Sequence, residues 1–97
     1  MKFEFSAGGI VVKEQDKNPL ILLSQHSQHH GWIFPKGLIG DHKKGETKED
    51  TAIREVEEET GARGRIIKPL TPVTYWYIWD NEKIKKTVYY FIERRCL

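Results

Sequence analysis

The 97-residue chain has little of several features that define other classes of protein. Its one cysteine, Cys96, stands next to the C-terminus, so no internal disulfide can form and we expect a reducing, cytoplasmic location. No apolar run approaches the roughly 20 residues that a membrane helix needs. Residues 1–5 also lack the apolar centre of a signal peptide. The sequence therefore predicts neither a disulfide scaffold, nor a membrane protein, nor a secreted one.

Net charge is small as well, at +2, and by itself it does not favour nucleic-acid binding. The charges are unevenly placed, because acidic residues gather between Glu46 and Glu59. Basic residues gather near the C-terminus, at Lys83, Lys85, Lys86, Arg94 and Arg95. This separation fits a cation site beside an anion site, and it fits chance clustering on a solvated surface equally well. The length and composition predict one globular domain over residues 1–97.

The order of local patterns predicts an α+β domain with a mixed sheet. Strand patterns occupy residues 3–13, 20–23, 32–34, 73–79 and 86–92. The last two flank the turn signal Asp80-Asn81-Glu82, which predicts a hairpin. The run 20–23 is wholly apolar, so we expect a buried strand there. Proline and three glycines within residues 35–46 predict a loop.

One helix is predicted from Lys48 to Thr60 by the residues at its ends. Thr47 is a suitable N-cap, and Asp50, three residues later, suits the positive end of the helix dipole. Gly61 is a suitable residue to end the helix in the left-handed conformation. The helical period predicts an inward stripe of Ala52, Ile53, Val56 and Thr60.

Three glutamates of this helix, Glu55, Glu58 and Glu59, are spaced so that their carboxylates can converge beside the apolar stripe. Glu57 points to the other side. Like charges at this spacing destabilise a helix, and so does negative charge in its last turns. A divalent cation would reverse that effect, because hard cations prefer carboxylate oxygen. Considered on the helix alone, an acidic solvated face is an equally good interpretation.

Glu46 and Arg54 stand eight residues apart across the junction of loop and helix, about two helical turns. An ion pair between them would fix the loop against the helix. Glu46 also suits the helix N-terminus as an acid favoured by the dipole. Both interpretations can hold at once.

Together these residues match the Nudix signature, G-x5-E-x7-R-E-U-x-E-E-x-G-U, in which U is apolar. Its fixed positions are filled by Gly40, Glu46, Arg54, Glu55, Val56, Glu58, Glu59, Gly61 and Ala62. Segments 6–12 and 85–91 also look like strands of the family, and segment 32–37 looks like the lead into the signature, so nearly the whole chain is covered. The sequence thus resembles the Nudix (MutT-like) hydrolases. It is most similar to their diadenosine-polyphosphate branch, with nucleoside-triphosphate pyrophosphatases as the close alternative.

This resemblance implies hydrolysis of a pyrophosphate bond in a nucleoside-diphosphate derivative, with Mg²⁺ or Mn²⁺ as cofactor. The implied metal ligands are Glu55, Glu58 and Glu59, together with a backbone carbonyl in the loop. That carbonyl belongs to Gly40 by formal spacing, or to Gly37 by its Trp-x-Phe-Pro-Lys context, and we favour Gly37. Glu58 or Glu59 is the implied base, without a choice between them. Glu46 and Arg54 are counted with the catalytic machinery.

Substrate-binding residues are expected beside the loop and on the sheet. Lys36 can meet a phosphate as a point charge, although a solvated lysine is the plain alternative. Aromatic residues at 75, 76, 77 and 79 alternate across the sheet, so only one set can face a ligand. We expect Tyr75 and Tyr77 to bind the nucleotide, although burial in a core would also explain the aromatic residues.

The sequence departs from the family where it ends. Family domains normally continue past residues 86–92 to a second helix that covers the sheet, and Leu97 stands before that helix. We therefore expect an exposed sheet face, or a homo-oligomer that covers it, in a natural short form or a fragment. Two rival functions remain: a nucleotide-binding module without hydrolysis, and an RNA-binding domain that uses the basic hairpin and its aromatics. The intact signature argues against both.

Overall fold

The computed structural model describes residues 1–15, 18–25, 30–41 and 43–96, with only the backbone of residues 14 and 15. Its elements follow in this order: β1 (Lys2–Gln15), β2 (Asn18–Ile21), β3 (Ser24–Gln25), β4 (Trp32–Ile33), β5 (Lys36–Leu38), α1 (Lys48–Thr60), β6 (Gly64–Pro69), β7 (Val73–Trp79) and β8 (Glu82–Arg95). The predicted α+β class is therefore confirmed. Within the described ranges, α1 is the only helix, and none is long and apolar enough to cross a membrane.

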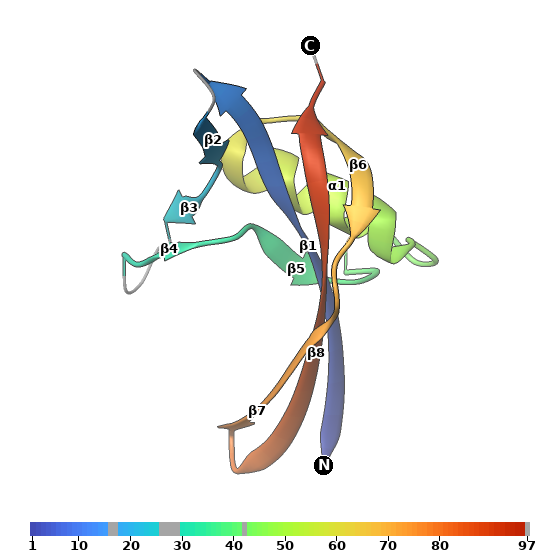
Figure 1. Ribbon diagram of the computed structural model, residues 1–97. Coiled ribbons are helices and arrows are strands. Elements are labelled where there is room, and N and C mark those ends of the chain that lie inside the picture. Colours follow the sequence, from blue (N-terminus) through green and yellow to red (C-terminus); the bar gives the residue numbers. More distant parts are fainter. Residues whose placement is uncertain (16–17, 26–29, 42, 97) are drawn as a thin grey trace.

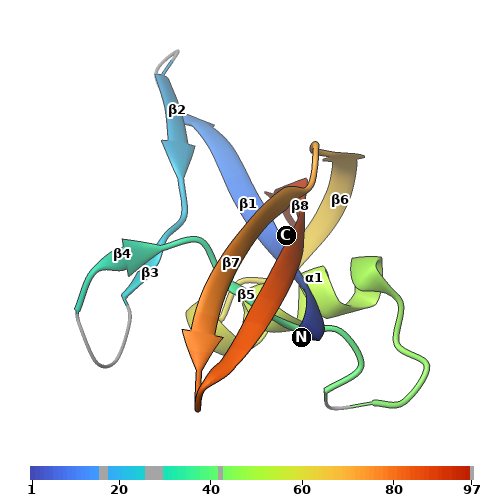
Figure 2. The ribbon, with the colours of Figure 1, turned by 90° about the horizontal axis from the view of Figure 1, so that it is seen from below.

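Two long strands, β1 and β8, form the centre of the mixed sheet and run parallel to one another (Figure 1). β2 and β5 pair antiparallel with successive parts of β1, while β6 and β7 pair antiparallel with β8. β3 and β4 form a separate two-stranded ribbon. The view from below shows the helix on one side of the sheet and this ribbon off its edge (Figure 2).

The helix covers one face of the sheet, and its ends are capped as the sequence predicts. The Asp50 N–H donates to the Thr47 hydroxyl at 3.1 Å, and Gly61 has φ of 79°. Two small buried clusters join helix to sheet: Ala52 packs with Ala7 and Phe91, and Val56 packs with Val11 and Ala62. The alternate residues of β1 that face the helix are thus small, which lets α1 approach closely.

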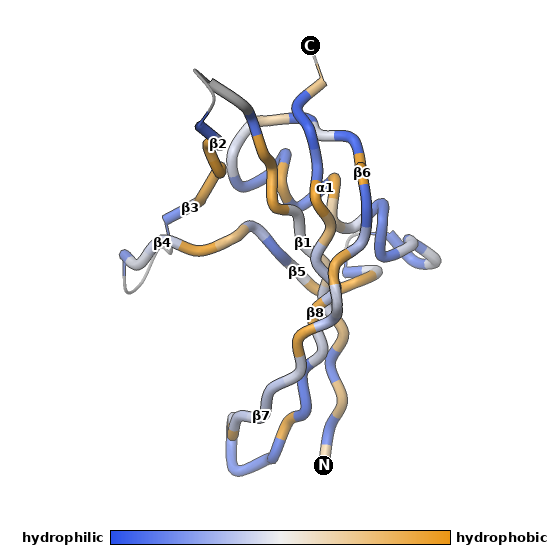
Figure 3. Tube along the Cα trace, in the orientation of Figure 1, coloured by the Kyte–Doolittle hydropathy of each residue, from blue (hydrophilic) through white to orange (hydrophobic). Residues whose placement is uncertain are grey.

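Beyond the helix, β1, β7 and β8 continue as a three-stranded extension that ends in a tight hairpin (Figure 1). Asp80 and Asn81 have φ of 52° and 59°, which fits the two-residue turn that matches the twist of a hairpin. Hydrophobic residues recur along this extension although no helix covers it (Figure 3). Its exposed apolar side chains are one reason to look for a ligand or a partner there.

Three expectations about local structure were wrong. Residues 20–23 do not form a buried strand, because β2 lies at the edge and Leu20 and Ile21 are 47% and 51% exposed. The predicted loop 35–46 contains β5, which pairs with β1 through Gly37 and Ala7. The inward stripe of α1 is Thr51, Ala52, Glu55 and Val56, whereas Ile53 and Thr60 are only partly buried.

Candidate active site

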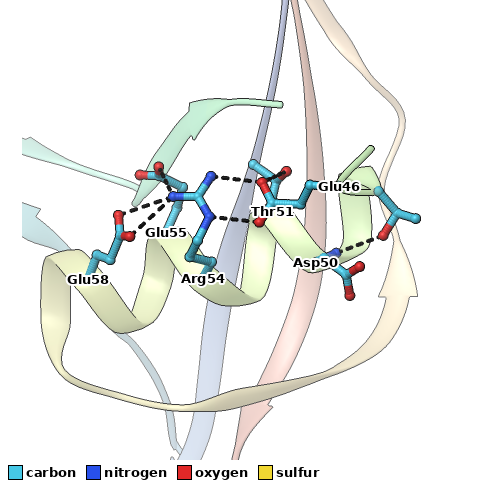
Figure 4. A network of polar contacts seen from close by, with 7 residues as sticks. Glu46, Asp50, Thr51, Arg54, Glu55 and Glu58 are labelled. Carbon is cyan, nitrogen blue, oxygen red and sulfur yellow. Dashed lines mark hydrogen bonds and ion pairs between the residues drawn. The ribbon is translucent and has the colours of Figure 1, made fainter. Parts of the chain in front are cut away.

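Arg54 is the centre of the polar network on α1 (Figure 4). Its guanidinium makes two parallel contacts with Glu46, from Nε to Oε2 at 2.8 Å and from Nη2 to Oε1 at 2.9 Å. The remaining nitrogen, Nη1, donates to Glu55 at 2.9 Å and to Glu58 at 3.2 Å. The predicted ion pair between loop and helix is confirmed, and the same arginine also joins two of the three converging glutamates.

Glu46 is held as a carboxylate by this network. Its hydrogen bond with Arg54 is the main reason that its pKa falls to about 2, and a hydrogen bond from Thr51 at 2.7 Å adds to the effect. The backbone of Gly40 also donates to Glu46. Gly40 itself has φ of 76°, a conformation that favours glycine, so it forms the turn that brings the loop back to the helix.

Gly37 stands directly against Glu55. A β-carbon at residue 37 would overlap the Glu55 carboxylate, so no larger residue fits while Glu55 keeps this position. Glu55 is buried, with 8% of its surface exposed, between strand β5 and Arg54. The two glycines therefore differ in role: Gly37, in β5, makes room for a helix carboxylate, and Gly40 makes a turn.

Glu59 completes the acidic group beside β5. Burial, and next the adjacent Glu55 carboxylate, raise its pKa to about 7, against opposing hydrogen bonds from the Ser24 hydroxyl and the Lys36 N–H. Two carboxylates this close to one another are a good pair of ligands for a divalent cation, which would offset their charge. The donor set of Glu55, Glu58 and Glu59 therefore fits a hard metal ion. In the described part of the chain, however, no three acidic, histidine or cysteine side chains already form a metal-binding group.

The predicted substrate residues lie on the face of the sheet opposite α1. Strand register puts Lys36 in one row with Gly8 and Tyr90, and puts Tyr75 in one row with Lys86. Tyr75 and Tyr77 have ring centroids 6.2 Å apart. The Tyr77 hydroxyl donates a hydrogen bond to the Glu4 carboxylate. This bond raises the pKa of Tyr77 to about 12 and joins β7 to β1 on this face.

Sequence reasoning missed three members of this face, which are Phe34, Lys86 and Tyr90. Burial lowers the pKa of Lys86, and the ammonium of Lys36 lowers it further. Tyr90 packs edge-on against Phe34, with centroids 5.9 Å apart. The alternation of residues along 85–91 could have put Lys86 and Tyr90 on one side. Only the pairing of β8 with β1 and β7 shows that this is the side of Lys36 and Tyr75.

Comparison with known proteins agrees with this architecture. The NUDIX domain model matches residues 2–96. A putative mutator protein, MutT4, of Mycobacterium tuberculosis is 38% identical over 97 residues, which covers 94% of this chain and 38% of that protein. An RNA pyrophosphohydrolase of Baumannia cicadellinicola is 36% identical over 59 residues, or 61% of this chain and 35% of the relative. A crystal structure of an Ap4A hydrolase from C. elegans superposes with a TM-score of 0.72 at 26% identity, covering 97% of this chain and 68% of the other.

The mixed sheet, the carboxylate-bearing helix and the matched domain model together define a class of protein. The chain belongs to the Nudix family. It spans well under half the length of the curated relatives named above, at 38% and 35%.

Proposed function

We propose that this chain hydrolyses a pyrophosphate bond in a nucleoside-diphosphate derivative, with Mg²⁺ or Mn²⁺ as cofactor. The observation that carries the proposal is the Arg54 network. One guanidinium holds Glu46, Glu55 and Glu58 together, and the Glu59 carboxylate lies beside that of Glu55. The negative charge of these four carboxylates exceeds the charge of one arginine, so the group suits a divalent cation better than a merely solvated helix face, and the cation would in turn bind the phosphate chain.

The residues that would hold the cation are Glu55, Glu58 and Glu59, with the backbone carbonyl of Gly37 as a further ligand. The contact of Gly37 with Glu55 supports our choice of Gly37 over Gly40. Bound there, the cation would neutralise charge on the diphosphate and lower the pKa of a water molecule.

The protein's own side chains supply the base, the residue that positions the carboxylates and the groups that bind phosphate. Glu58 or Glu59 accepts the proton of the attacking water, and the raised pKa of Glu59 suits a base that works near neutral pH. Arg54 is a positioning residue, because it holds the carboxylates and Glu46 in one arrangement. Lys36 and Lys86 bind the phosphate chain. Burial, and next the repulsion by Lys36, lower the pKa of Lys86, and an anion between the two lysines would relieve that repulsion.

Diadenosine tetraphosphate is our preferred substrate. The C. elegans structure described as an Ap4A hydrolase supports this choice, and so does the aromatic face around Tyr75 and Tyr77, on which an adenine can stack. A nucleoside triphosphate is the second candidate, favoured by similarity to the putative mutator protein. The single cysteine, Cys96, supports a cytoplasmic location for either reaction.

The test is to incubate the chain with diadenosine tetraphosphate and Mg²⁺ and to separate the nucleotide products. Glu58→Gln removes one proposed ligand, and Glu57→Gln is the matched control because Glu57 lies on the exposed side with Arg63 at 3.6 Å. We expect ATP and AMP from the wild type and from Glu57→Gln, and none from Glu58→Gln. Turnover of nucleoside triphosphates alone would favour the second candidate. Tight nucleotide binding without any product would overturn hydrolysis and leave a binding module.

A further inference from the structure

The three-stranded extension has two chemically different faces. Register and alternation put Phe3, Lys85 and Trp76 in one row across β1, β8 and β7. Phe5 lies in the next row of the same face towards the helix, and Ile78 pairs with Lys83 in the row beyond. We call this surface the aromatic–lysine face; it consists of Phe3, Phe5, Trp76, Ile78, Lys83 and Lys85. It is the face that α1 covers higher up, so it is opposite the face of Lys36 and Tyr75.

The apolar members of this face are strongly exposed. Phe3 and Phe5 are 54% and 49% exposed, and Trp76 and Ile78 are 48% and 73% exposed. A group of large exposed side chains on one face of a sheet is unusual for a surface that meets only water. Flat aromatic rings on strands are the usual stacking platforms for unpaired bases.

The charges on the two faces are segregated. The ammonium groups of Lys83 and Lys85 lie 4.7 and 5.4 Å from the centre of the Trp76 ring. The acidic residues of these strands, Glu4 and Glu82, alternate onto the opposite face, where Glu4 accepts from Tyr77. The aromatic–lysine face is therefore positive although the chain carries a net charge of only +2.

We propose that the aromatic–lysine face binds single-stranded nucleic acid, with bases stacked on the rings and phosphates paired with the lysines. Contacts between an exposed lysine and an indole are weaker than base stacking on that indole, so a base can displace the ammonium groups. Their flexible stems let them turn to the phosphates instead. The sequence alone did not favour nucleic acid as a partner. The separation of charges between the two faces of the extension becomes visible only once the strands are paired.

A second copy of the chain fits this face less well. In a two-fold symmetric interface the same patch meets itself, so the lysines of one copy would lie close to those of the other. Like charges opposed across an interface are unfavourable, whereas a phosphate backbone complements them.

None of the six side chains that define the aromatic–lysine face is specific for the ribose hydroxyl, so RNA and DNA share the required chemistry. This inference does not depend on hydrolysis at Glu58 and Glu59.

The test is fluorescence anisotropy with labelled oligouridine and oligothymidine of about 12 nucleotides, a length that covers a typical binding site. The oligonucleotides carry 5′-hydroxyl ends and the buffer contains EDTA, so that the proposed metal site takes no part. Trp76→Ala is compared with Trp79→Ala, because Trp79 alternates onto the opposite face and is 72% exposed. Thermal unfolding of both variants checks that each remains folded.

We expect saturable binding that weakens about tenfold or more in Trp76→Ala and little in Trp79→Ala. In the double variant Lys83→Ala/Lys85→Ala, the slope of log affinity against log salt should fall by about 1.4, while the control Lys68→Ala keeps most of it. Equal affinity for the two oligomers would confirm shared chemistry, and a strong preference for one would identify the source. Absence of binding at about 50 mM salt would overturn the proposal. Self-association that is lost in Trp76→Ala without any nucleic-acid binding would also overturn it, and would assign the face to a second copy.

Discussion

Gly37 and Glu55 occupy adjoining space so closely that a single added methyl group at residue 37 would overlap the carboxylate. Gly37 is fixed by its pairing with Ala7 in the sheet, and Glu55 is fixed on its other side by Arg54 Nη1 at 2.9 Å. A carboxylate in the middle of the helix is therefore positioned by a strand as well as by its own helix.

The first prediction is that Gly37→Ala displaces the Glu55 carboxylate. Residue 37 lies in a strand and is not among the glycines with positive φ, so alanine fits the backbone. The clash is with the end of a flexible side chain, so the free energy of unfolding should change by only about 1 kcal/mol. The affinity for Mn²⁺, measured by titration with detection of the free ion, should fall about tenfold or more, because one ligand of a proposed site is moved.

Gly45→Ala is the matched control for this variant. Gly45 has φ of 83° and nothing within 4 Å of an added β-carbon, so alanine strains the backbone without touching a carboxylate. The control should lose stability and keep its Mn²⁺ affinity. If Gly37→Ala binds Mn²⁺ as well as the wild type, Gly37 does not position Glu55 for a metal.

The second prediction concerns the ion pair of Glu46 with Arg54. The pKa of Glu46 is lowered to about 2 from an ordinary 4.5, chiefly by Arg54. A lowered pKa means that the carboxylate stabilises the fold above about pH 4.5, and that this contribution disappears as the pH falls towards 2. At pH 7, Glu46→Gln should cost roughly 1 to 2 kcal/mol, allowing for solvent screening near the surface.

Urea unfolding of the wild type and of Glu46→Gln at pH 7, 5 and 3 measures this difference. The gap between the two curves should narrow as the pH falls. Glu57→Gln serves as control, because the Glu57–Arg63 pair at 3.6 Å joins two exposed side chains and should contribute under about 1 kcal/mol. A gap that stays constant with pH would show that the Glu46 carboxylate does not stabilise the fold through its charge.

Glu93 is a second acidic residue with an unusual environment, and it lies outside the proposed site. It is completely buried between the sheet and α1, beside Gly9, Gly64 and Val56, and neither carboxylate oxygen has a hydrogen-bond partner. Burial raises its pKa to about 7. An acid in this position is tolerated because it can remain protonated.

The third prediction is that Glu93 makes the fold weaker as the pH rises. Because its pKa is higher in the folded state than in the unfolded chain, its contribution is complete below about pH 4.5 and is lost as the pH rises through 7. Glu93→Gln cannot ionise, so at pH 8 it should be more stable than the wild type by roughly 2 to 3 kcal/mol. At pH 5 the two should differ little.

Thermal unfolding of wild type and Glu93→Gln between pH 5 and 8 tests this prediction. Glu82→Gln, in the same strand β8 but exposed, should follow the wild type at every pH. Parallel curves for wild type and Glu93→Gln would show that Glu93 is ionised in the fold throughout, or protonated throughout, this range.

The elements with local signals were predictable from sequence. Thr47 and Gly61 bound the helix because capping depends on a few adjacent residues, and the hairpin turn depends on Asp80 and Asn81 alone. The pair of Glu46 and Arg54 was also predictable, since a helix places residues at fixed intervals and the spacing fits the family signature.

Features that depend on strand pairing were not predictable in this way. β5 is only three residues long, and it exists because Gly37 can pair with Ala7 beside the helix. The apolar residues Leu20 and Ile21 are exposed because β2 pairs only with the end of β1, a fact of topology rather than of local hydropathy. Glu93 reads as a surface residue in sequence, and only the small neighbours Gly9 and Gly64 make room to bury it.

The last prediction separates the two faces of β8. Lys86 lies on the face of Lys36 and Tyr75, whereas Lys83 lies on the aromatic–lysine face. Lys86→Met should raise the KM for diadenosine tetraphosphate about tenfold or more, because a charged contact with phosphate is lost, and should change kcat by less than about threefold. Lys83→Met is the matched control and should leave both constants near the wild-type values while it weakens oligonucleotide binding. Steady-state kinetics of the two variants measures KM and kcat and so tests this prediction. Equal increases in KM would mean that the substrate meets general positive charge, and a fall in kcat alone for Lys86→Met would place Lys86 nearer the reacting phosphate than the sheet register indicates.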